Sequence, residues 1–442
     1  MPARPFVTLP DATAFRIVRA RVPDCLAATP ARNTTGAGLA ACEIVVDRGR
    51  IARLGAPGST SPDLPTVDMQ DGLVLPRFVD LHTHIDKGHI SGRAPNPDGT
   101  FLGARQATMA DREANWTAED VRRRMEFSLR CAFAHGTGAL RTHVDSLGKQ
   151  AAVSWPVFAE MRETWRDRVA LQAVALFPYD LAVDDEPQFK ALVATVARHG
   201  GVLGGLTFMG SPPDEMLRLA LDRLVAAASA NGLDLDFHVD ESGSPDARSL
   251  EEIAAAALHH RFRGRIVAGH CCSLALADEG DRARVIERVG EAGIAIVSLP
   301  MCNLYLQDRH AKRTPRWRGV APLHELDAAG VTVAVASDNT RDPFYAYGDL
   351  DMVEVFREAT RILHLDHSDR PWMRLLGRTA AEVMGLEGRG VLREGDPADL
   401  VLVSARDAAE LVTRPQSDRV VLVGGRAIDT VPPDYRELDR IR

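Results

Sequence analysis

Residues 73–84 read LVLPRFVDLHTH, an apolar run of the strand type that ends in two histidines. Amphipathic stretches at 118–136, 213–232, 249–262, 281–293 and 321–330 each end near a glycine, as helices commonly do. They alternate with seven further apolar runs: ALRTHVD (139–145), VALQAVALF (169–177), VLGGLTF (202–208), LDLDFHVDE (233–241), RIVAGHCC (265–272), IAIVSLPM (294–301) and VTVAVASD (331–338). Eight strand–helix units in series predict an α/β fold, a TIM-type (β/α)8 barrel.

An open doubly wound sheet is the alternative for the same alternation of strands and helices. It has little support here, because no GxGxxG motif follows the first strand. The two ends of the chain differ from the middle. FRIVRARV (15–22) and CEIVVDRGRIARLG (42–55) near one end, and ADLVLVSA (398–405) and DRVVLVGGRAI (418–428) near the other, have strand character without a helical period.

The composition excludes several classes of protein. There are 61 acidic and 53 basic side chains, a net charge of -8, whereas proteins that neutralise nucleic-acid phosphates carry a basic surplus. The six cysteines have no CxxC spacing, which argues against a zinc knuckle or a disulfide framework. No uncharged apolar run approaches the length of a membrane span, and the first residues lack a signal-peptide core. We therefore expect a cytoplasmic protein with no nucleic-acid or membrane partner.

Polar side chains gather where the predicted strands end. In a barrel these ends meet at one rim, which carries the active site. Side chains alternate along a strand, so both imidazoles of His82-x-His84 face one side and can reach one cation. So many buried polar groups without a shared purpose would be costly. The pattern predicts a metal site among the strand-end residues His82, His84, His143, Asp145, His238, Glu241, His270 and Asp338.

The motifs at these strand ends resemble those of the amidohydrolase superfamily, in particular its cytosine deaminase branch. They are PRFVDLHTHIDKG, LRTHVD, LQAVALFP, HVDE, GHCC, NLYLQDR and SDNTRDPFYAYGD, followed by GVLREGDPADLVLV near the C-terminus. The resemblance covers the barrel and both flanks. It implies a barrel over 76–385 and a small β-sandwich built from both chain ends, residues 1–75 and 386–442.

The resemblance also implies a role for individual residues. His82, His84, His238 and Asp338 match the metal ligands, and Glu241 matches the carboxylate that shuttles protons. His270 matches the histidine that polarises the attacking water, and Gln172 the amide that reads the ring. One divalent ion, Zn or Fe, suits three imidazoles and a carboxylate. The implied activity is hydrolytic deamination of an amino-substituted nitrogen heterocycle by a metal-activated hydroxide.

Other positions are open to more than one interpretation. Binuclear relatives use a Lys or Glu at the end of strand four, where VLGGLTFMG (202–210) has neither, so we expect one metal ion. His143 is interpreted as a residue that orients a ligand rather than as a ligand. Lys87 lies beyond its strand end and suggests a loop or substrate-rim role, or an ion pair with Asp86. Cys271 and Cys272 are interpreted as small apolar fillers; a thiolate ligand is the alternative. The basic loop KRTPRWRG (312–319) is either a solvated turn or a substrate contact.

Two positions set the chain apart from cytosine deaminases. Asn339 stands where that branch has a second aspartate, and Phe344 where it has a pocket tryptophan. The Asp-Asn pair resembles N-isopropylammelide amidohydrolases, although those lack the glutamate found here at position 241. A carboxamide can donate as well as accept a hydrogen bond. We therefore expect a small heterocyclic substrate other than cytosine, of pyrimidine, triazine or purine type, with Asn339 and Phe344 lining its pocket.

Two rival functions remain at this stage. The same metal site is able to hydrolyse a cyclic amide or lactone, which an ammonia-release assay would separate from deamination. A catalytically silent metal-binding scaffold would be expected to have lost a ligand or the proton-shuttling carboxylate, and all of these are present. The sequence leaves open whether the chain forms a homo-oligomer.

Overall fold

The computed structural model describes residues 6–29, 38–207 and 210–441, with side chains to residue 439. The chain divides into two compact units. The first comprises Met1–Leu81, Leu129–Ala139 and Leu350–Asp434. The second comprises His82–Ser128, Leu140–Asp349 and Tyr435–Arg442. In the described part of the chain, no helix has both the length and the apolar character needed to cross a membrane.

Strands from both chain ends share one eight-stranded sheet in the first unit. Its order is β16-β15-β14-β5-β1-β2-β3, with β4 paired to β1. The strands are β1 (Ala14–Pro23), β2 (Leu39–Asp47), β3 (Arg50–Gly55), β4 (Thr66–Asp68), β5 (Leu73–Pro76), β14 (Leu400–Val403), β15 (Val420–Val423) and β16 (Arg426–Ala427). A register shift between Ile17 and Ala20 in β1 keeps Phe15, Ile17, Ala20 and Val22 all buried, because the extra residue turns the strand by one side-chain position. The matching composition of the two chain ends thus reflects a shared sheet.

The run at 73–84 forms two strands, and the expectation of a single strand is wrong. β5 pairs with β14, whereas β6 (Phe78–Thr83) pairs with β7 (Thr137–Asp145). The change of partner occurs at Arg77, whose N–H donates to Asp399 O, while the next N–H, of Phe78, donates to Gly136 O. All residues of both strands are buried, so hydrophobicity gives no sign of the change.

A second group of strands carries the predicted alternation with helices. β6-β7-β8 form one sheet, and β13-β12-β11-β10-β9 form a parallel one. Isolated parallel bridges join Val174 to Val202 and Pro178 to Leu206, between β8 and β9, and Thr83 to Asp338, between β6 and the segment after β13. The remaining strands are β8 (Ala170–Leu176), β9 (Leu203–Leu206), β10 (Leu235–Val239), β11 (Ile266–His270), β12 (Ile294–Ser298) and β13 (Val333–Val335). Each predicted run therefore contains a strand; Phe208 and Met209, the expected end of the fourth, lie outside the described residues.

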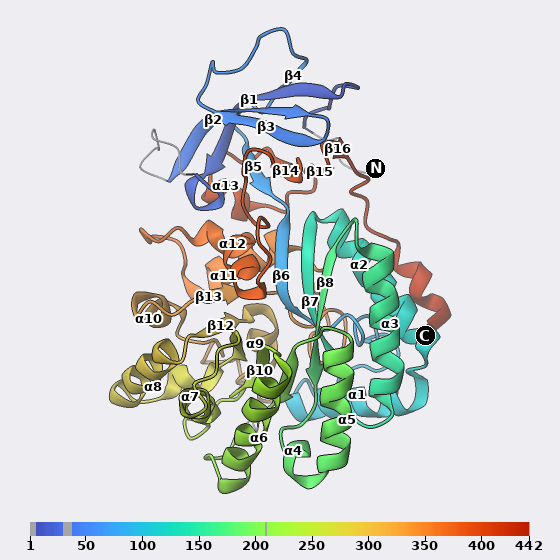
Figure 1. Ribbon diagram of the computed structural model, residues 1–442, viewed down its shortest axis with the longest axis vertical. Helices are drawn as coiled ribbons and strands as arrows, with labels where there is room; N and C mark the ends of the chain where they lie inside the picture. Colours follow the sequence, from blue (N-terminus) through green and yellow to red (C-terminus); the bar gives the residue numbers. More distant parts are fainter. Residues whose placement is uncertain (1–5, 30–37, 208–209, 442) are drawn as a thin grey trace. The chain divides into compact units, whose positions relative to one another are not determined.

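All five predicted helices are present, and their ends follow the sequence signals. α6 begins after Asp214, whose side chain accepts the N–H of Leu217, and ends at Gly232 with a φ of 63°. In Figure 1, α3 lies on the outer side of β7 and β8, and α7 on the outer side of β10. The helices are α1 (Phe101–Asn115), α2 (Ala118–Ala134), α3 (Gln150–Trp165), α4 (Leu181–Asp184), α5 (Glu186–Arg198), α6 (Glu215–Asn231), α7 (Ser249–His259), α8 (Glu279–Glu291), α9 (Pro300–Leu306), α10 (Leu323–Ala328), α11 (Met352–Leu363), α12 (Arg378–Met384) and α13 (Ala408–Thr413). Short 3₁₀ helices cover Asp24–Leu26, Cys272–Leu276, Trp372–Leu376 and Tyr435–Ile441.

Candidate metal centre and active site

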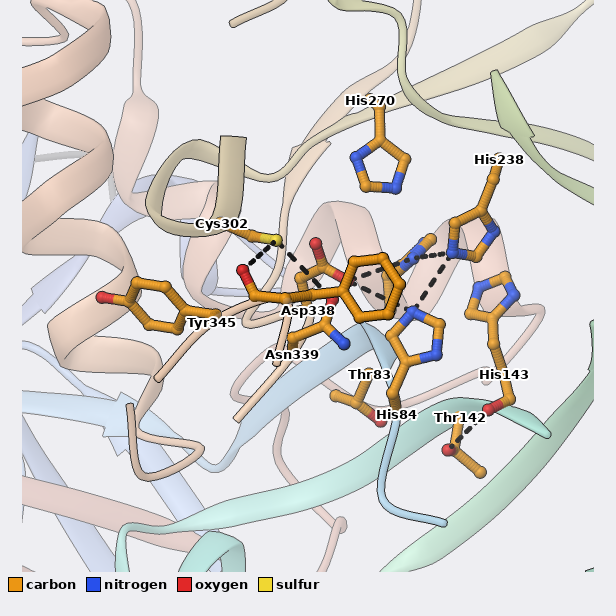
Figure 2. Close-up of polar contacts among 12 residues, drawn as sticks. Thr83, His84, Thr142, His143, His238, His270, Cys302, Asp338, Asn339 and Tyr345 are labelled. Carbon is orange, nitrogen blue, oxygen red and sulfur yellow. Dashed lines mark hydrogen bonds and ion pairs between the residues drawn. The ribbon is translucent and has the colours of Figure 1, made fainter. Parts of the chain in front are cut away.

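Three imidazoles and one carboxylate converge where β6, β10 and β13 end (Figure 2). His238 Nε2 lies 3.3 Å from His82 Nε2 and 3.1 Å from His84 Nε2. Asp338 Oδ1 lies 3.2 Å from His84 Nε2 and 3.7 Å from His82 Nε2. The four side chains predicted as metal ligands are therefore brought together, each from a strand end as the barrel pattern requires.

The donor set fits a divalent cation. All four side chains are buried, and burial is the main cause that lowers the pKa of His82, His84 and His238 well below the usual range. The imidazoles are therefore neutral, and each one that carries its proton on Nδ1 offers its Nε2 lone pair to a cation. Among the described residues, none accepts a hydrogen bond from Nδ1 of these three histidines. Three imidazoles and one carboxylate are the ligands that Zn²⁺ or Fe²⁺ takes, and we regard the fit as good.

The backbone at these strand ends is shaped to aim the side chains. Asp338 has a φ of 62°, and its N–H donates to His82 O at 2.9 Å. His270 also has a positive φ, 69°. Such left-handed conformations cost free energy in residues other than glycine and cluster at functional sites. Gly269 serves a different purpose, since a Cβ there would lie 2.9 Å from Cε1 and 3.1 Å from Nδ1 of His82. Only glycine leaves room for that ring.

Glu241 and His270 form a second pair beside the histidine cluster. His270 Nδ1 lies 3.4 Å from Glu241 Oε1. Asn303, on α9, places its Nδ2 3.2 Å from Glu241 Oε1 and 2.9 Å from His270 Nδ1. Gln307 Nε2 donates to Glu241 O at 3.1 Å. Neither Asn303 nor Gln307 was predicted as a site residue from the sequence, although both lie in the NLYLQDR motif.

The Glu241 carboxyl group is tuned to hold a proton. Burial is the largest cause that raises its pKa well above the usual value, and the negative charge of Asp338 adds to the effect. The Lys87 ammonium opposes both. A carboxyl group whose pKa is raised keeps its proton to higher pH than a free one, and is able to donate it to a substrate nitrogen and to take one back.

Buried Arg141 links half-buried Gln172 to Asp236, the carboxylate beside His143. His143 Nε2 lies 3.7 Å from Asp236 Oδ1, and the His143 and His82 rings are 3.9 Å apart between centroids. Arg141 Nη1 donates to Asp236 Oδ2 at 2.8 Å, and Arg141 Nη2 to Gln172 Oε1 at 2.9 Å. This places His143 against a predicted metal ligand, and the amide oxygen of Gln172 on Arg141.

Asn339 and Phe344 lie in the segment that follows β13. Asn339 Nδ2 donates to Asp342 Oδ2 at 2.6 Å, and the Cys302 thiol lies 3.6 Å from Asn339 Oδ1. Lys87 is buried, with its ammonium 4.4 Å from the centroid of the Phe344 ring. Lys87 therefore contacts a residue predicted to line the pocket, whereas Asp86 accepts the N–H of Asp145 at 2.8 Å.

The remaining predicted elements lie close to these residues. Cys271 and Cys272 are fully buried, and burial raises the pKa of both thiols well above the usual value, so both are neutral. In the basic loop at 312–319, Asp308 accepts the N–H of Trp317 at 3.2 Å. The Trp317 ring lies against Gly243, two residues beyond Glu241. Lys312, Thr314 and Arg316 are exposed, so most of the loop faces solvent, and a contact between this loop and the substrate stays a prediction.

Comparison with known proteins places this arrangement in a class. The family model of the amidohydrolase family matches residues 127–429. The chain belongs to this family of metal-dependent hydrolases, which confirms the resemblance inferred from the strand-end motifs.

Three individual proteins are similar along nearly their whole length. The chain is 54% identical over 437 residues to a pterin deaminase of Rhizobium rhizogenes, covering 99% of this chain and 98% of the relative. The crystal structure of 5-methylcytosine deaminase from Klebsiella pneumoniae with 5-fluorocytosine has a TM-score of 0.78 at 24% identity, covering 94% of this chain and 97% of that one. N-isopropylammelide isopropylaminohydrolase from Burkholderia multivorans has a TM-score of 0.73 at 27% identity, covering 94% and 98%. The chain is thus a hydrolytic deaminase of the amidohydrolase family.

Proposed function

We propose that this deaminase acts on a pterin-type ring, a fused 2-amino-4-oxo heterocycle, and replaces its amino group by oxygen. Water is consumed and ammonia leaves. The observation that carries the proposal is the 54% identity, over 99% of the chain, to a pterin deaminase. The prediction that cytosine is a poor substrate agrees with this proposal. Pterin carries a hydrogen on the ring nitrogen N3, beside its amino-bearing carbon, whereas the corresponding nitrogen of cytosine carries none, so the two rings offer Asn339 different hydrogen-bonding groups.

One divalent ion, Zn or Fe, would be held by His82, His84, His238 and Asp338. When bound, such an ion lowers the pKa of water towards about 7 and so supplies hydroxide near neutral pH. A single ion is favoured because β9, Leu203–Leu206, offers no Lys or Glu as a ligand for a second one. His143 would orient His82 through ring packing, and Asp236 would hold His143.

The proton transfers would be carried by Asp338, Glu241 and His270. Asp338 takes a proton from the attacking water at a carboxylate oxygen. Glu241 donates its proton to the ring nitrogen next to the amino-bearing carbon, and Asn303 holds the carboxyl group in place. The His270 imidazole, hydrogen-bonded to Asn303 through Nδ1, leaves Nε2 for the attacking oxygen. Ammonia then departs with a proton from Asp338, and the remaining hydroxyl proton passes to Glu241 as the new carbonyl forms, which restores both carboxyl groups. Gln172 and Phe344 remain proposed substrate contacts. Arg141 donates to the amide oxygen of Gln172, which leaves the Gln172 NH₂ group to contact the substrate.

The limits and closure of the domains are part of the proposal. We assign a closed (β/α)8 barrel to 76–385 and a small β-sandwich to 1–75 and 386–442. Support for closure comes from the bridges between Val174 and Val202 and between Thr83 and Asp338, which link the free edges of the two groups of parallel-type strands. Support for the second domain comes from the pairing of β5 with β14.

An ammonia-release assay tests the function. Metal-replete protein is incubated with pterin, cytosine, 5-methylcytosine, ammelide and isoguanine, and kcat/KM is measured for each. We expect pterin to be best and cytosine poor. Ammonia release from cytosine at the highest kcat/KM would contradict the substrate assignment. Opening of a cyclic amide without release of ammonia would identify the rival hydrolase activity instead.

A further inference from the structure

Asp342 is a buried carboxyl group that touches Asn339 and has no role in the proposed proton transfers. Its side chain is fully buried. Oδ2 accepts a hydrogen bond from Asn339 Nδ2 at 2.6 Å. Oδ1 accepts the N–H groups of Phe344 at 2.8 Å and Tyr345 at 3.1 Å. All three partners donate to Asp342, which is what an acceptor-only carboxylate requires.

This contact fixes which way the Asn339 amide points. An asparagine can turn by half a revolution and exchange its donor and acceptor. Here the turned state would put Asn339 Oδ1 against Asp342 Oδ2, which loses a charge-assisted hydrogen bond and adds a repulsion. Nδ2 therefore faces Asp342. Oδ1 faces Cys302, whose thiol lies 3.6 Å away (Figure 2).

The side on which Oδ1 lies is the side of the proton-transfer groups. The Cys302 thiol beside Oδ1 also hydrogen-bonds with Asp338, which takes part in the proposed proton transfers. The next residue on α9, Asn303, contacts both Glu241 and His270. Asn339 itself follows Asp338, a predicted metal ligand. An acceptor is therefore fixed within the same set of contacts that would surround the amino-bearing carbon of a substrate.

We propose that Asp342 is a positioning residue for specificity: it makes Asn339 a hydrogen-bond acceptor towards the substrate, so the ring must present an N–H beside its amino-bearing carbon. The proposal rests on the proposed function and narrows its substrate class. Pterin meets the requirement, because its N3 carries a hydrogen next to C2. The 2,4-diamino analogue has nearly the same shape but an acceptor lone pair at N3. The wild-type protein should prefer pterin to this analogue by about 10-fold or more in kcat/KM.

Replacing one atom of Asp342 should invert this preference. In Asp342→Asn, the new Oδ1 still accepts from Phe344 and Tyr345, which leaves the new NH₂ group to face Asn339. Asn339 then has to turn its own oxygen towards that group and its NH₂ towards Cys302. We expect the ratio of kcat/KM for pterin to that for the diamino analogue to fall by about 10-fold or more and to favour the analogue.

A second variant restores the original polarity with different atoms. Asn339→Asp combined with Asp342→Asn places a carboxylate at 339, which accepts from the NH₂ group at 342 and presents an acceptor to the ring. Preference for pterin should return. Asn339→Asp alone sets two carboxylates about 2.6 Å apart by the contact seen in the wild type, and should lower both the melting temperature and the rate. Asp366→Asn, at an exposed position, is the matched control and should change neither.

The outcomes separate this inference from the proposed function. If Asp342→Asn lowered the rates on both rings equally and left their ratio unchanged, Asp342 would only support the loop and the inference would be wrong. Wild-type protein that releases ammonia from other rings but not from pterin would overturn the proposed substrate. The melting temperatures test the contact between Asn339 and Asp342. A double variant that regains the stability lost in Asn339→Asp supports the inference, whereas equal losses in Asp342→Asn, Asn339→Asp and the double variant overturn it.

Discussion

Two regions bury charged or polar side chains in opposite ways. In the first unit, Arg419 donates to both oxygens of Asp351, at 2.8 and 2.6 Å, and also to His135 O at 3.0 Å. At the ends of β6 and β10, three buried imidazoles face one another through their Nε2 atoms, with His238 Nε2 3.3 Å from that of His82 and 3.1 Å from that of His84. A buried polar group is costly unless it is paired. In the first region the charges of Arg419 and Asp351 satisfy each other. In the second, three imidazoles and a carboxylate are arranged as the ligands of a cation.

Removal of a ligand histidine is the most direct way to break this comparison. His82→Ala or His238→Ala should lower bound metal from about one equivalent towards zero and abolish turnover, because two imidazoles and a carboxylate hold a cation poorly. Elemental analysis after gel filtration measures the metal. His367→Ala, at a side chain that is 96% exposed, is the control and should keep full metal content. Full metal in both ligand variants would contradict the assignment.

Breaking the paired region should affect stability rather than chemistry. Asp351→Asn leaves the Arg419 guanidinium buried without its counter-charge, which costs about 3–5 kcal/mol in the free energy of unfolding. Urea denaturation of wild type and variant measures it. Glu382→Gln removes an exposed partner of Arg378 and should change little. Equal effects of the two substitutions would show that the Asp351 pair is not special.

The same pair gives a pH dependence with a definite sign. Burial is the largest single influence and would by itself raise the pKa of Asp351, but the charges of Arg419 and His135 and the hydrogen bonds from Arg419 and the Val353 N–H together outweigh it and hold the pKa below the ordinary value. The unfolded chain therefore binds this proton more readily than the folded one. The stabilisation is complete above about pH 4, the ordinary pKa of aspartate, and declines as the pH falls below it. Asp351→Asn should flatten the acid side of the stability curve.

Loss of the proton on Glu241 should be a smaller effect than loss of the metal. Glu241→Gln keeps the shape and the hydrogen bond from Asn303 but can no longer exchange a proton, so kcat should fall by about 10² or more while metal content is kept. Glu113→Gln, at an exposed position on α1, serves as the control. Turnover near the wild-type rate in Glu241→Gln would reduce Glu241 to a structural residue.

The smallest effect is expected from a substitution that leaves every metal-binding side chain in place but crowds the His82 ring. Gly269→Ala places a methyl group 2.9 Å from Cε1 of His82 and should tilt that ring. Metal affinity should fall by about 10- to 100-fold, the scale seen when the surroundings of a ligand are disturbed. Gly290→Ala, where the nearest atom is 3.9 Å away, is the control. Titration of metal against a competing chelator gives the affinities of the two variants. Equal affinities in Gly269→Ala and Gly290→Ala would show that displacement of the His82 ring does not weaken metal binding.

The strands and the predicted metal ligands could be located from the sequence, because strands follow the apolar runs and the ligands lie where those runs end. All eight apolar runs contain strands, and His82, His84, His238 and Asp338 meet although 256 positions of numbering separate the first from the last. It did not find Asn303, because an asparagine inside an apolar helix carries no local sign that its amide will reach two strand ends. It also missed the exchange of partners at Arg77, where buried residues continue on both sides.

The orientation of the Asn339 amide could not be predicted from the sequence either. The sequence indicated that Asn339 has both a donor and an acceptor to offer, and the motif gave no reason to choose between them. The choice depends on a hydrogen bond of 2.6 Å to a residue three positions further on. That contact exists only because the backbone turns, with φ of 62° at Asp338 and 48° at Arg341. Turns of this kind are set by tertiary contacts, which residue types alone do not report.

The pairing of β5 with β14 has a consequence for how the protein is made. Leu73–Pro76 leave the ribosome more than 300 residues before their partner Leu400–Val403, so one edge of β5 stays without its neighbour during most of synthesis. Unpaired apolar edges of this kind favour association with other chains. Contacts so distant along the chain also form slowly, because a long loop must close first. Completion of the sheet is therefore a late event, and chains that terminate before β14 are released with an open, aggregation-prone edge.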